Sequence, residues 1–193
     1  MKAFPYTIID LTHTLSETTP SWSGGCGFNH EIALDYSDCQ DDVKFRVQKL
    51  KMHAGIGTHI DAPAHAIPGS TTVDDLKLEN LISPCVCIDV SKDIIADSLI
   101  SPDAVLLFEK EHGKIEPGSF VIIYTGWDKF WNEPDQYRND HQFPSISEEI
   151  AVLLLERGIT GLGIDTLSPD TSSSGFPVHK HLLGAGKYII ENI

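Results

Sequence analysis

The amino-acid sequence predicts an α/β protein, a single domain with a mixed β-sheet and flanking helices. Short apolar runs typical of buried strands alternate with segments that have the periodicity of amphipathic helices. The chain has 193 residues, 41% of them hydrophobic and 22% charged, and no long polar or repetitive tract divides it. We therefore expect one domain over residues 1–193, built around a single core.

Six segments are expected to form strands. The first opens the chain as YTIIDLTHTL, and the second, VKFRVQKLKMH, alternates apolar and polar residues at period two. The other four are short apolar runs of the buried type; in one of them Cys85 and Cys87 are expected to act as small buried residues without a chemical role. In chain order the expected strands are 6–15, 43–53, 85–90, 119–127, 159–166 and 187–193.

Two segments are expected to form helices. Residues 101–114 carry apolar residues on one face and end at Gly113, whereas residues 145–158 begin with a Ser-x-x-Glu capping box and end at Gly158. The segments rich in Pro, Gly and Asp are expected to be loops, where functional residues are often found. These loops are 16–30, 61–75, 132–145 and 166–178.

Charge and targeting signals narrow the possible functions. With 28 acidic against 14 basic residues the net charge is −14, which argues against binding to nucleic acid or to an anionic membrane. The four cysteines have no CxxC spacing, so neither a disulfide framework nor a zinc module is expected. The N-terminal segment lacks the features of a signal peptide and no apolar run approaches about 18 residues, which predicts a cytoplasmic protein.

The segment KMHAGIGTHIDAPAHAIPG, residues 51–69, concentrates imidazoles and a carboxylate in a stretch that glycine and proline keep from being helical. In an extended chain His53, His59, Asp61 and His65 all fall on one face. Two interpretations are open at this point: a hydrogen-bonded His–Asp pair that orients a loop, or a metal site.

Distances along the chain favour some of these residues over others as metal ligands. At about 3.3 Å per residue, Asp61 lies roughly 7 Å from His59, close enough for both side chains to bind one ion. His53 would lie about 20 Å from His59 unless the intervening glycines fold the chain back, so it is the weaker candidate. Glu191 stands inside a strand-like apolar run, where a carboxylate requires a cation unless it points into solvent.

Together these motifs resemble the cyclase-like metal-dependent hydrolase family of the bacterial kynurenine formamidase and isatin hydrolase type. GTHIDAPAH resembles the family signature HxGTHxDxPxH, and further similar segments occur in the family order over nearly the whole chain. They are IIDLTHTLSETTPSWSG, YTGW, FPSIS, GIDTLSPD and HKHLLGAGKYIIEN. The resemblance implies the family's swivelling β/β/α fold.

The resemblance also implies a centre of one or two metal ions, Zn²⁺ or Mn²⁺. Asp61 would bridge the ions, His59 would bind one ion, and His179 with Glu191 would bind the other. His65, the last histidine of the signature, corresponds to the family's general acid/base. Metal ions held by such ligands lower the pKa of a bound water toward about 7 and polarise an amide carbonyl.

The sequence departs from the family pattern in two places. The family has a histidine four residues before His59, where this chain has Gly55. Either His53 reaches the metal through a glycine-bent loop, or the first ion has lost a ligand. In addition, the chain stops at Ile193, where the family usually continues, so we expect the last C-terminal strand of the family to be lacking.

The expected function is that of a metal-dependent amidohydrolase, arylformamidase-like, that cleaves a small amide, formamide or lactam. A cyclase or lyase on the same site, or a metal-binding protein without catalysis, are the alternatives. Trp22 resembles the family's aromatic substrate contact and lies in a Pro/Ser/Gly loop, which favours an aromatic amide as the small-molecule substrate. By resemblance we expect a homodimer or homotetramer.

Three other features receive weaker assignments. Asp165 follows an apolar strand and either orients a ligand histidine or caps the loop after it. His13 is expected to be a structural histidine. The aromatic residues of GWDKFW, residues 126–131, are expected to pack in the core rather than contact substrate.

Overall fold

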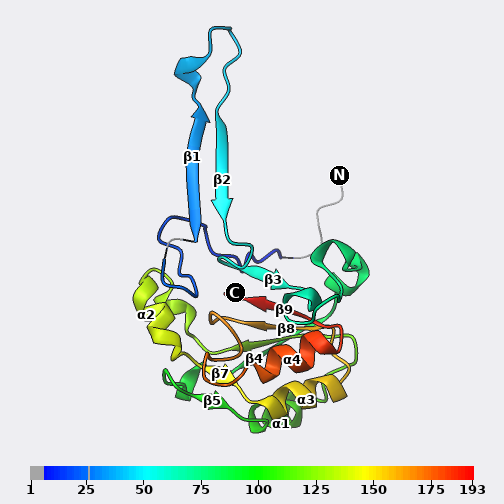
Figure 1. The fold of residues 1–193 in the computed structure, drawn as a ribbon. Coiled ribbons are helices and arrows are strands. Elements are labelled where there is room, and N and C mark those ends of the chain that lie inside the picture. Colours follow the sequence, from blue (N-terminus) through cyan, green and yellow to red (C-terminus); the bar gives the residue numbers. More distant parts are fainter. Residues whose placement is uncertain (1–6, 26) are drawn as a thin grey trace.

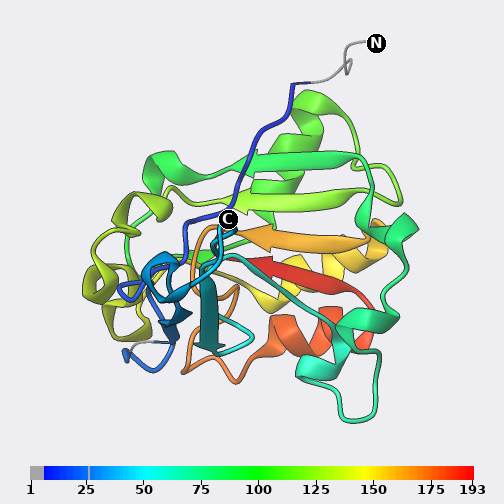
Figure 2. The same ribbon diagram turned by 90° about the horizontal axis from the view of Figure 1, so that it is seen from above.

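The computed structural model describes residues 7–25 and 27–193, and its centre is a five-stranded mixed sheet in the order β3-β9-β8-β6-β4. Strands β4, β6, β8 and β9 are parallel to one another, and β3 is antiparallel to β9. Figure 2 shows these parallel strands side by side. Their bounds are β3 His59–Asp61, β4 Cys85–Asp89, β6 Phe120–Tyr124, β8 Gly161–Ile164 and β9 Tyr188–Glu191. The expected α/β class is confirmed.

Three helices cover one face of the sheet (Figure 1), namely α1 Asp103–His112, α3 Glu148–Glu156 and α4 Pro177–Gly184. Alternate strand residues such as Val121, Leu162 and Ile189 point into the core between sheet and helices and are fully buried. A shorter helix, α2 Pro134–Arg138, and a two-stranded parallel pair, β5 Leu99–Ile100 with β7 Ser145–Ile146, complete the body. The two expected helices are therefore confirmed as α1 and α3.

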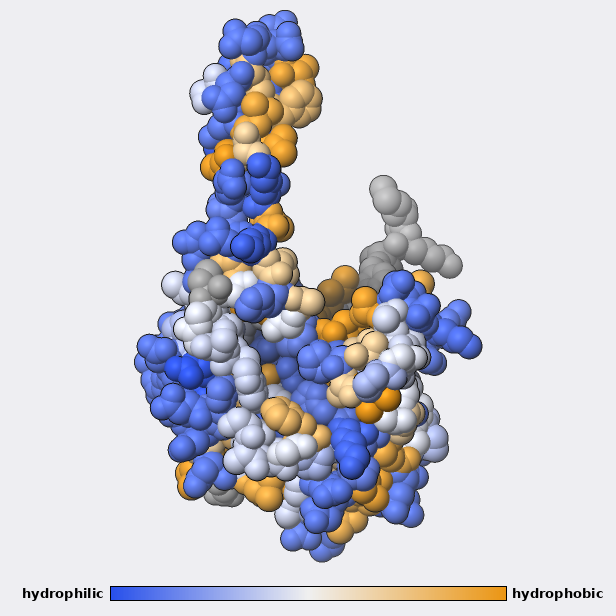
Figure 3. Space-filling model, viewed as in Figure 1, coloured by the Kyte–Doolittle hydropathy of each residue, from blue (hydrophilic) through white to orange (hydrophobic). Residues whose placement is uncertain are grey.

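A long antiparallel hairpin projects from this body (Figure 1), formed by β1 Phe28–Leu34 and β2 Val47–Met52. Paired residues share a face, so Ile32, Leu50 and Met52 lie on one side of the ribbon and Glu31 and Lys49 on the other. The three apolar side chains are exposed, and Figure 3 shows apolar surface along the hairpin.

Two expectations about strands were wrong. In the described part of the first segment, residues 7–15, no strand forms, and Ile8 and Ile9 are exposed because no neighbouring strand pairs with them. Cys85 and Cys87 do lie in a strand, but both are exposed rather than buried. The reason is that β4 is an edge strand and only β6 pairs with it.

Other expectations about packing hold. Trp127 and Trp131 pack with Tyr137 and Phe143 in a separate buried aromatic cluster, as expected for the GWDKFW segment. His13 stacks on Trp131 with ring centroids 3.9 Å apart, and its Nε2 is buried without a hydrogen-bond partner among the described residues, so its expected structural role stays a prediction. Within the described ranges, none of the helices combines the length and apolarity needed to cross a membrane.

Candidate metal centre

Pairing of β3 with β9 brings His59 and Glu191 together. The two residues are opposite one another in the antiparallel register, and Asp61 is opposite Ile189. Because Ile189 is buried in the core under the helices, Asp61 points to the same side, and His59 and Glu191 follow at period two. His59 Nε2 lies 3.5 Å from Asp61 Oδ1 and 3.5 Å from Glu191 Oε2.

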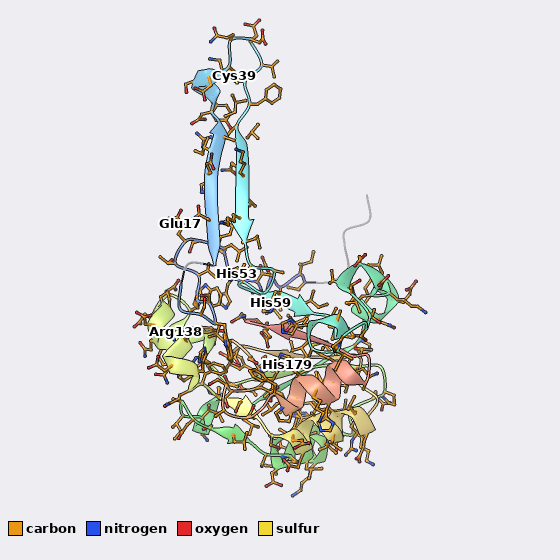
Figure 4. The ribbon with its side chains drawn as sticks, in the orientation of Figure 1. Glu17, Cys39, His53, His59, Arg138 and His179 are labelled. Carbon is orange, nitrogen blue, oxygen red and sulfur yellow. The ribbon has the colours of Figure 1, made fainter. Side chains whose placement is uncertain are left out.

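His179, which lies on helix α4 (Figure 4), faces the same two carboxylates. His179 Nε2 lies 3.7 Å from Asp61 Oδ2 and 3.4 Å from Glu191 Oε1. On its other side, Asp170 Oδ2 accepts hydrogen bonds from His179 Nδ1 at 2.8 Å and from the His179 backbone N–H at 3.0 Å. A proton on Nδ1 leaves the Nε2 lone pair directed toward the carboxylates, as a metal ligand requires.

His65 completes the cluster from the end of a short 3-10 helix, Pro63–His65. Its Nδ1 lies 3.7 Å from Asp61 Oδ1, and its ring centroid lies 5.8 Å from that of His179. More than half of the His65 side chain is exposed, whereas His59, His179 and the carboxylates are largely enclosed. His65 can therefore exchange protons with a molecule in the cavity.

The described residues fit a divalent metal ion. Asp61 Oδ2 and Glu191 Oε1 are buried, and no donor among the described residues forms a hydrogen bond to either oxygen. Ligand atoms about 2.1 Å from a tetrahedral zinc ion lie about 3.4 Å from one another. The separations of 3.4 Å and 3.5 Å from Glu191 to the two histidine nitrogens match this spacing. They are long for hydrogen bonds, so a shared cation accounts for them better.

Without a cation, protons on the imidazoles balance the buried carboxylates. Burial disfavours the charged form of His59, but the carboxylates of Asp61 and Glu191 outweigh it and raise the pKa of His59 to about 9. For His179, burial again opposes the charged form, but the carboxylates of Asp170, Asp61 and Glu191 outweigh it and raise the pKa to about 11. The histidines hold the pKa of Asp61 well below its usual range against the effect of burial, while burial raises the pKa of Glu191.

His53 lies outside the cluster, and Gly55 has no side chain. His53 is exposed at the base of the hairpin and belongs to neither group of potential ligand atoms. These groups are Asp61, His65 and His179, and His59, Asp61 and Glu191. Gly55 lies beside His59 and lines the adjoining cavity.

The centre opens into a cavity of about 450 Å³ with aromatic walls. Trp22 and Phe176 line it, with ring centroids 5.9 Å apart. Trp22 also stacks on His141 at 4.1 Å, and its backbone carbonyl lies 2.8 Å from His141 Nε2. The structure thus places Trp22 in the same cavity as His59, His65, His179 and Glu191.

Two buried polar residues around the centre have different roles. Among the described residues, the Asp165 side chain accepts hydrogen bonds from Thr125 and from the Trp127 backbone N–H and forms none with a histidine. It therefore fixes the loop after β6, and neither of its two expected roles is the one observed. Asp170, which the sequence analysis did not single out, supports His179. Its separation of nine residues from the histidine matches no local motif, and the sequence signal for it is its place as the last residue of the family-like segment GIDTLSPD.

Comparison with known proteins places these features in one family. The family model of the putative cyclases matches residues 9–171. An isatin hydrolase of Roseibium aggregatum is 33% identical over 141 residues, which cover 65% of this chain and 54% of that protein. A kynurenine formamidase of Bacillus cereus is 28% identical over 193 aligned positions, covering 96% of this chain and 81% of the relative.

Solved structures agree with this assignment. Isatin hydrolase A from Ralstonia solanacearum superposes with a TM-score of 0.84 at 28% identity, over 95% of this chain and 78% of the other. An isatin hydrolase bound to the product analogue thioisatinate gives a TM-score of 0.81 at 27% identity, over 95% and 78%. This chain therefore belongs to the putative cyclase family, together with isatin hydrolases and kynurenine formamidases.

Proposed function

We propose that this protein is a metal-dependent hydrolase that opens the C–N bond of a small amide, formamide or lactam. One observation carries the proposal: two buried carboxylate oxygens without hydrogen bonds, Asp61 Oδ2 and Glu191 Oε1, converge with two histidine nitrogens beside an aromatic cavity. The names of the relatives, isatin hydrolase and kynurenine formamidase, support the same class of bond.

His59, Asp61, His179 and Glu191 would hold the ion, with Asp61 and Glu191 shared between the two histidines. Bound Zn²⁺ or Mn²⁺ would supply Lewis acidity to the amide carbonyl and would promote ionisation of water. The protein's own contribution is to keep these ligands in place before substrate arrives. Asp170 does so for His179 through its two hydrogen bonds.

His65 is proposed to move the proton of the reaction. Its ring is exposed to the cavity, and its Nδ1 lies 3.7 Å from Asp61 Oδ1. A neutral imidazole can accept a proton from water and then return it to the leaving nitrogen. A group of this kind contributes about 10²–10⁴-fold to the rate.

The cavity favours a flat aromatic substrate. Trp22 and Phe176 present their rings to it, and Leu167 adds apolar surface. Aromatic walls bind planar rings well because they offer a large contact area with little loss of side-chain freedom. An aromatic amide would place its carbonyl at the polar end, next to the histidines.

The test is hydrolysis of N-formylkynurenine and of isatin, with metal content measured on the same samples. His65→Ala should retain the metal and lose about 10²–10⁴-fold in kcat, whereas His112→Ala, on the exposed end of α1, should behave as wild type. Full activity in His65→Ala would remove this histidine from the mechanism. Bound metal without hydrolysis of any amide would favour a metal-binding protein or a lyase.

We also propose that the chain forms a homodimer or homotetramer through the projecting hairpin. A two-stranded ribbon with exposed Ile32, Leu50 and Met52 is marginally stable alone in water, and a second copy would bury this face. Light scattering on a sizing column should give more than one chain per particle. Leu50→Lys should shift the protein toward the monomer, and an unchanged mass would exclude the hairpin as the contact.

A further inference from the structure

Gly55 lies beside Nε2 of His59, the nitrogen proposed to bind the metal, and leaves open space there because it has no side chain. A Cβ atom built at this glycine would lie 3.1 Å from His59 Nε2, the atom that faces Asp61 and Glu191. Any side chain at position 55 would therefore crowd this nitrogen. Gly55 also forms part of the wall of the aromatic cavity.

The backbone does not explain the glycine at this position. Gly57, two residues later, has a φ of +66° and a Cβ there would come within 2.4 Å of Leu15, so its conformation and its packing both require glycine. Gly55 lies outside the positive-φ region, and the three heavy atoms nearest to a Cβ built there all belong to the His59 ring. What distinguishes Gly55 is the open space that it leaves beside His59.

The ligand set on this side of the centre is small. The group of potential ligand atoms around His59 contains only Asp61 and Glu191 among the described residues, and both carboxylates also face His179. His53 lies outside it. An ion on the His59 side therefore has an open position that points into the cavity, where a bound molecule can reach it.

We infer that Gly55 opens a coordination position for a heteroaromatic ring nitrogen carried by the substrate. This inference rests on the proposed metal centre and narrows its substrate class to aromatic amides with an azole or pyridine-type nitrogen near the carbonyl. A planar ring fits between the aromatic walls, and neutral heteroaromatic nitrogen is a donor that zinc, manganese and cobalt accept.

Imidazole, the ring alone, tests the inference on Co²⁺-loaded protein, because Co²⁺ reports its ligands through visible absorption. Wild type should show a saturable change in spectrum at millimolar imidazole, as expected for a ligand with few atoms. Gly55→Ala should bind Co²⁺ and lose this change, since the methyl group fills the space. Gly25→Ala is the matched control, because a Cβ there meets no atom within 4 Å, and should respond as wild type.

Gly55→His provides an independent arm. Loss of a group that merely supports a ligand costs about 10–100-fold in metal affinity, so a complete additional ligand should raise Co²⁺ affinity by at least about tenfold and abolish the imidazole response. The inference is overturned if wild type holds Co²⁺ without responding to imidazole, or if Gly55→Ala responds equally. Failure of wild type to bind Co²⁺ would instead overturn the proposed function.

Discussion

The two histidines of the proposed metal centre face the same carboxylates, but different groups support them. His179 lies on α4, and the carboxylate of Asp170 accepts a hydrogen bond from its Nδ1 at 2.8 Å. His59 lies on the short edge strand β3, and its Nδ1 is 2.9 Å from the backbone carbonyl of Gly57. A carboxylate makes the stronger bond and raises ligand basicity more. The His179 side is therefore the better prepared half of the centre.

The largest effect is expected from Asp61→Asn, because Asp61 faces both histidines. This change removes the negative charge that Asp61 presents to both histidines. The value of kcat/KM for the amide substrate should therefore fall at least about a thousandfold, which equals roughly 4 kcal/mol of transition-state stabilisation. Both metal stoichiometry and kinetics should report it. Asp41→Asn at the exposed tip of the hairpin is the control. Metal loss confined to one half would show that Asp61 does not bridge.

Metal affinity should depend on pH, because His59 and His179 lose their protons at different pH values in the metal-free protein. In the metal-free protein the pKa of His59 is about 9 and that of His179 about 11, so a metal ion that binds near neutral pH must displace up to two protons. Apparent metal affinity should rise by up to about a hundredfold per pH unit below pH 9, and about tenfold per unit above it. Calorimetry in buffers of different ionisation enthalpy measures the protons released. An affinity independent of pH would contradict the arrangement.

The same raised pKa values determine how the metal-free fold depends on pH. Both rings have folded-state pKa values above their ordinary 6.5. Their contribution to the free energy of unfolding is therefore complete below pH 6.5 and is lost as the pH rises through about 9 and then about 11. Thermal melts of metal-free protein should show a lower Tm on the alkaline side, and bound metal should remove much of this dependence.

Asp170→Asn directly tests the His179 side, the better prepared half of the centre. Because the amide cannot replace the charged acceptor of His179 Nδ1, metal affinity on this side should fall about 10–100-fold while the His59 side is little affected. Asp165→Asn is the matched comparison, since this buried carboxylate accepts three hydrogen bonds but contacts no ligand. It should lower the free energy of unfolding by about 1–3 kcal/mol and leave metal affinity unchanged. Equal metal loss in both variants would mean that general stability is the cause.

The smallest effect on metal affinity is expected from Asn192→Ala, which acts on the His59 side of the centre. Asn192 Nδ2 donates to the Gly57 carbonyl at 3.0 Å, the same oxygen that lies beside His59 Nδ1. Its Oδ1 accepts from the buried Tyr137 hydroxyl. Affinity on the His59 side should fall by less than tenfold, while stability falls by about 1–3 kcal/mol. A larger metal effect than that of Asp170→Asn would reverse the ranking of the two halves.

Local sequence patterns were sufficient for the fold class and for much of the body. The apolar runs that became β6, β8 and β9, and the amphipathic segments that became α1 and α3, carry their own periodicity and end signals. The sequence also predicted that His59 and Asp61 share one face, because glycine and proline keep this part of the chain extended. Helix α4 and strand β1 were not anticipated. The first begins after a loop rich in Ser and Gly, and the second begins inside segment 16–30, which was expected to be a loop.

Motifs and resemblance were enough to name the candidate ligands of a cation, which are His59, Asp61, His179 and Glu191. Their meeting in space depends on the pairing of β3 with β9 across about 130 residues of chain, which puts His59 opposite Glu191. The tertiary structure also placed Asp170 behind His179, left His53 outside the ligand groups and exposed Cys85 and Cys87. Burial and long-range pairing depend on neighbours from distant segments, and no local pattern encodes them.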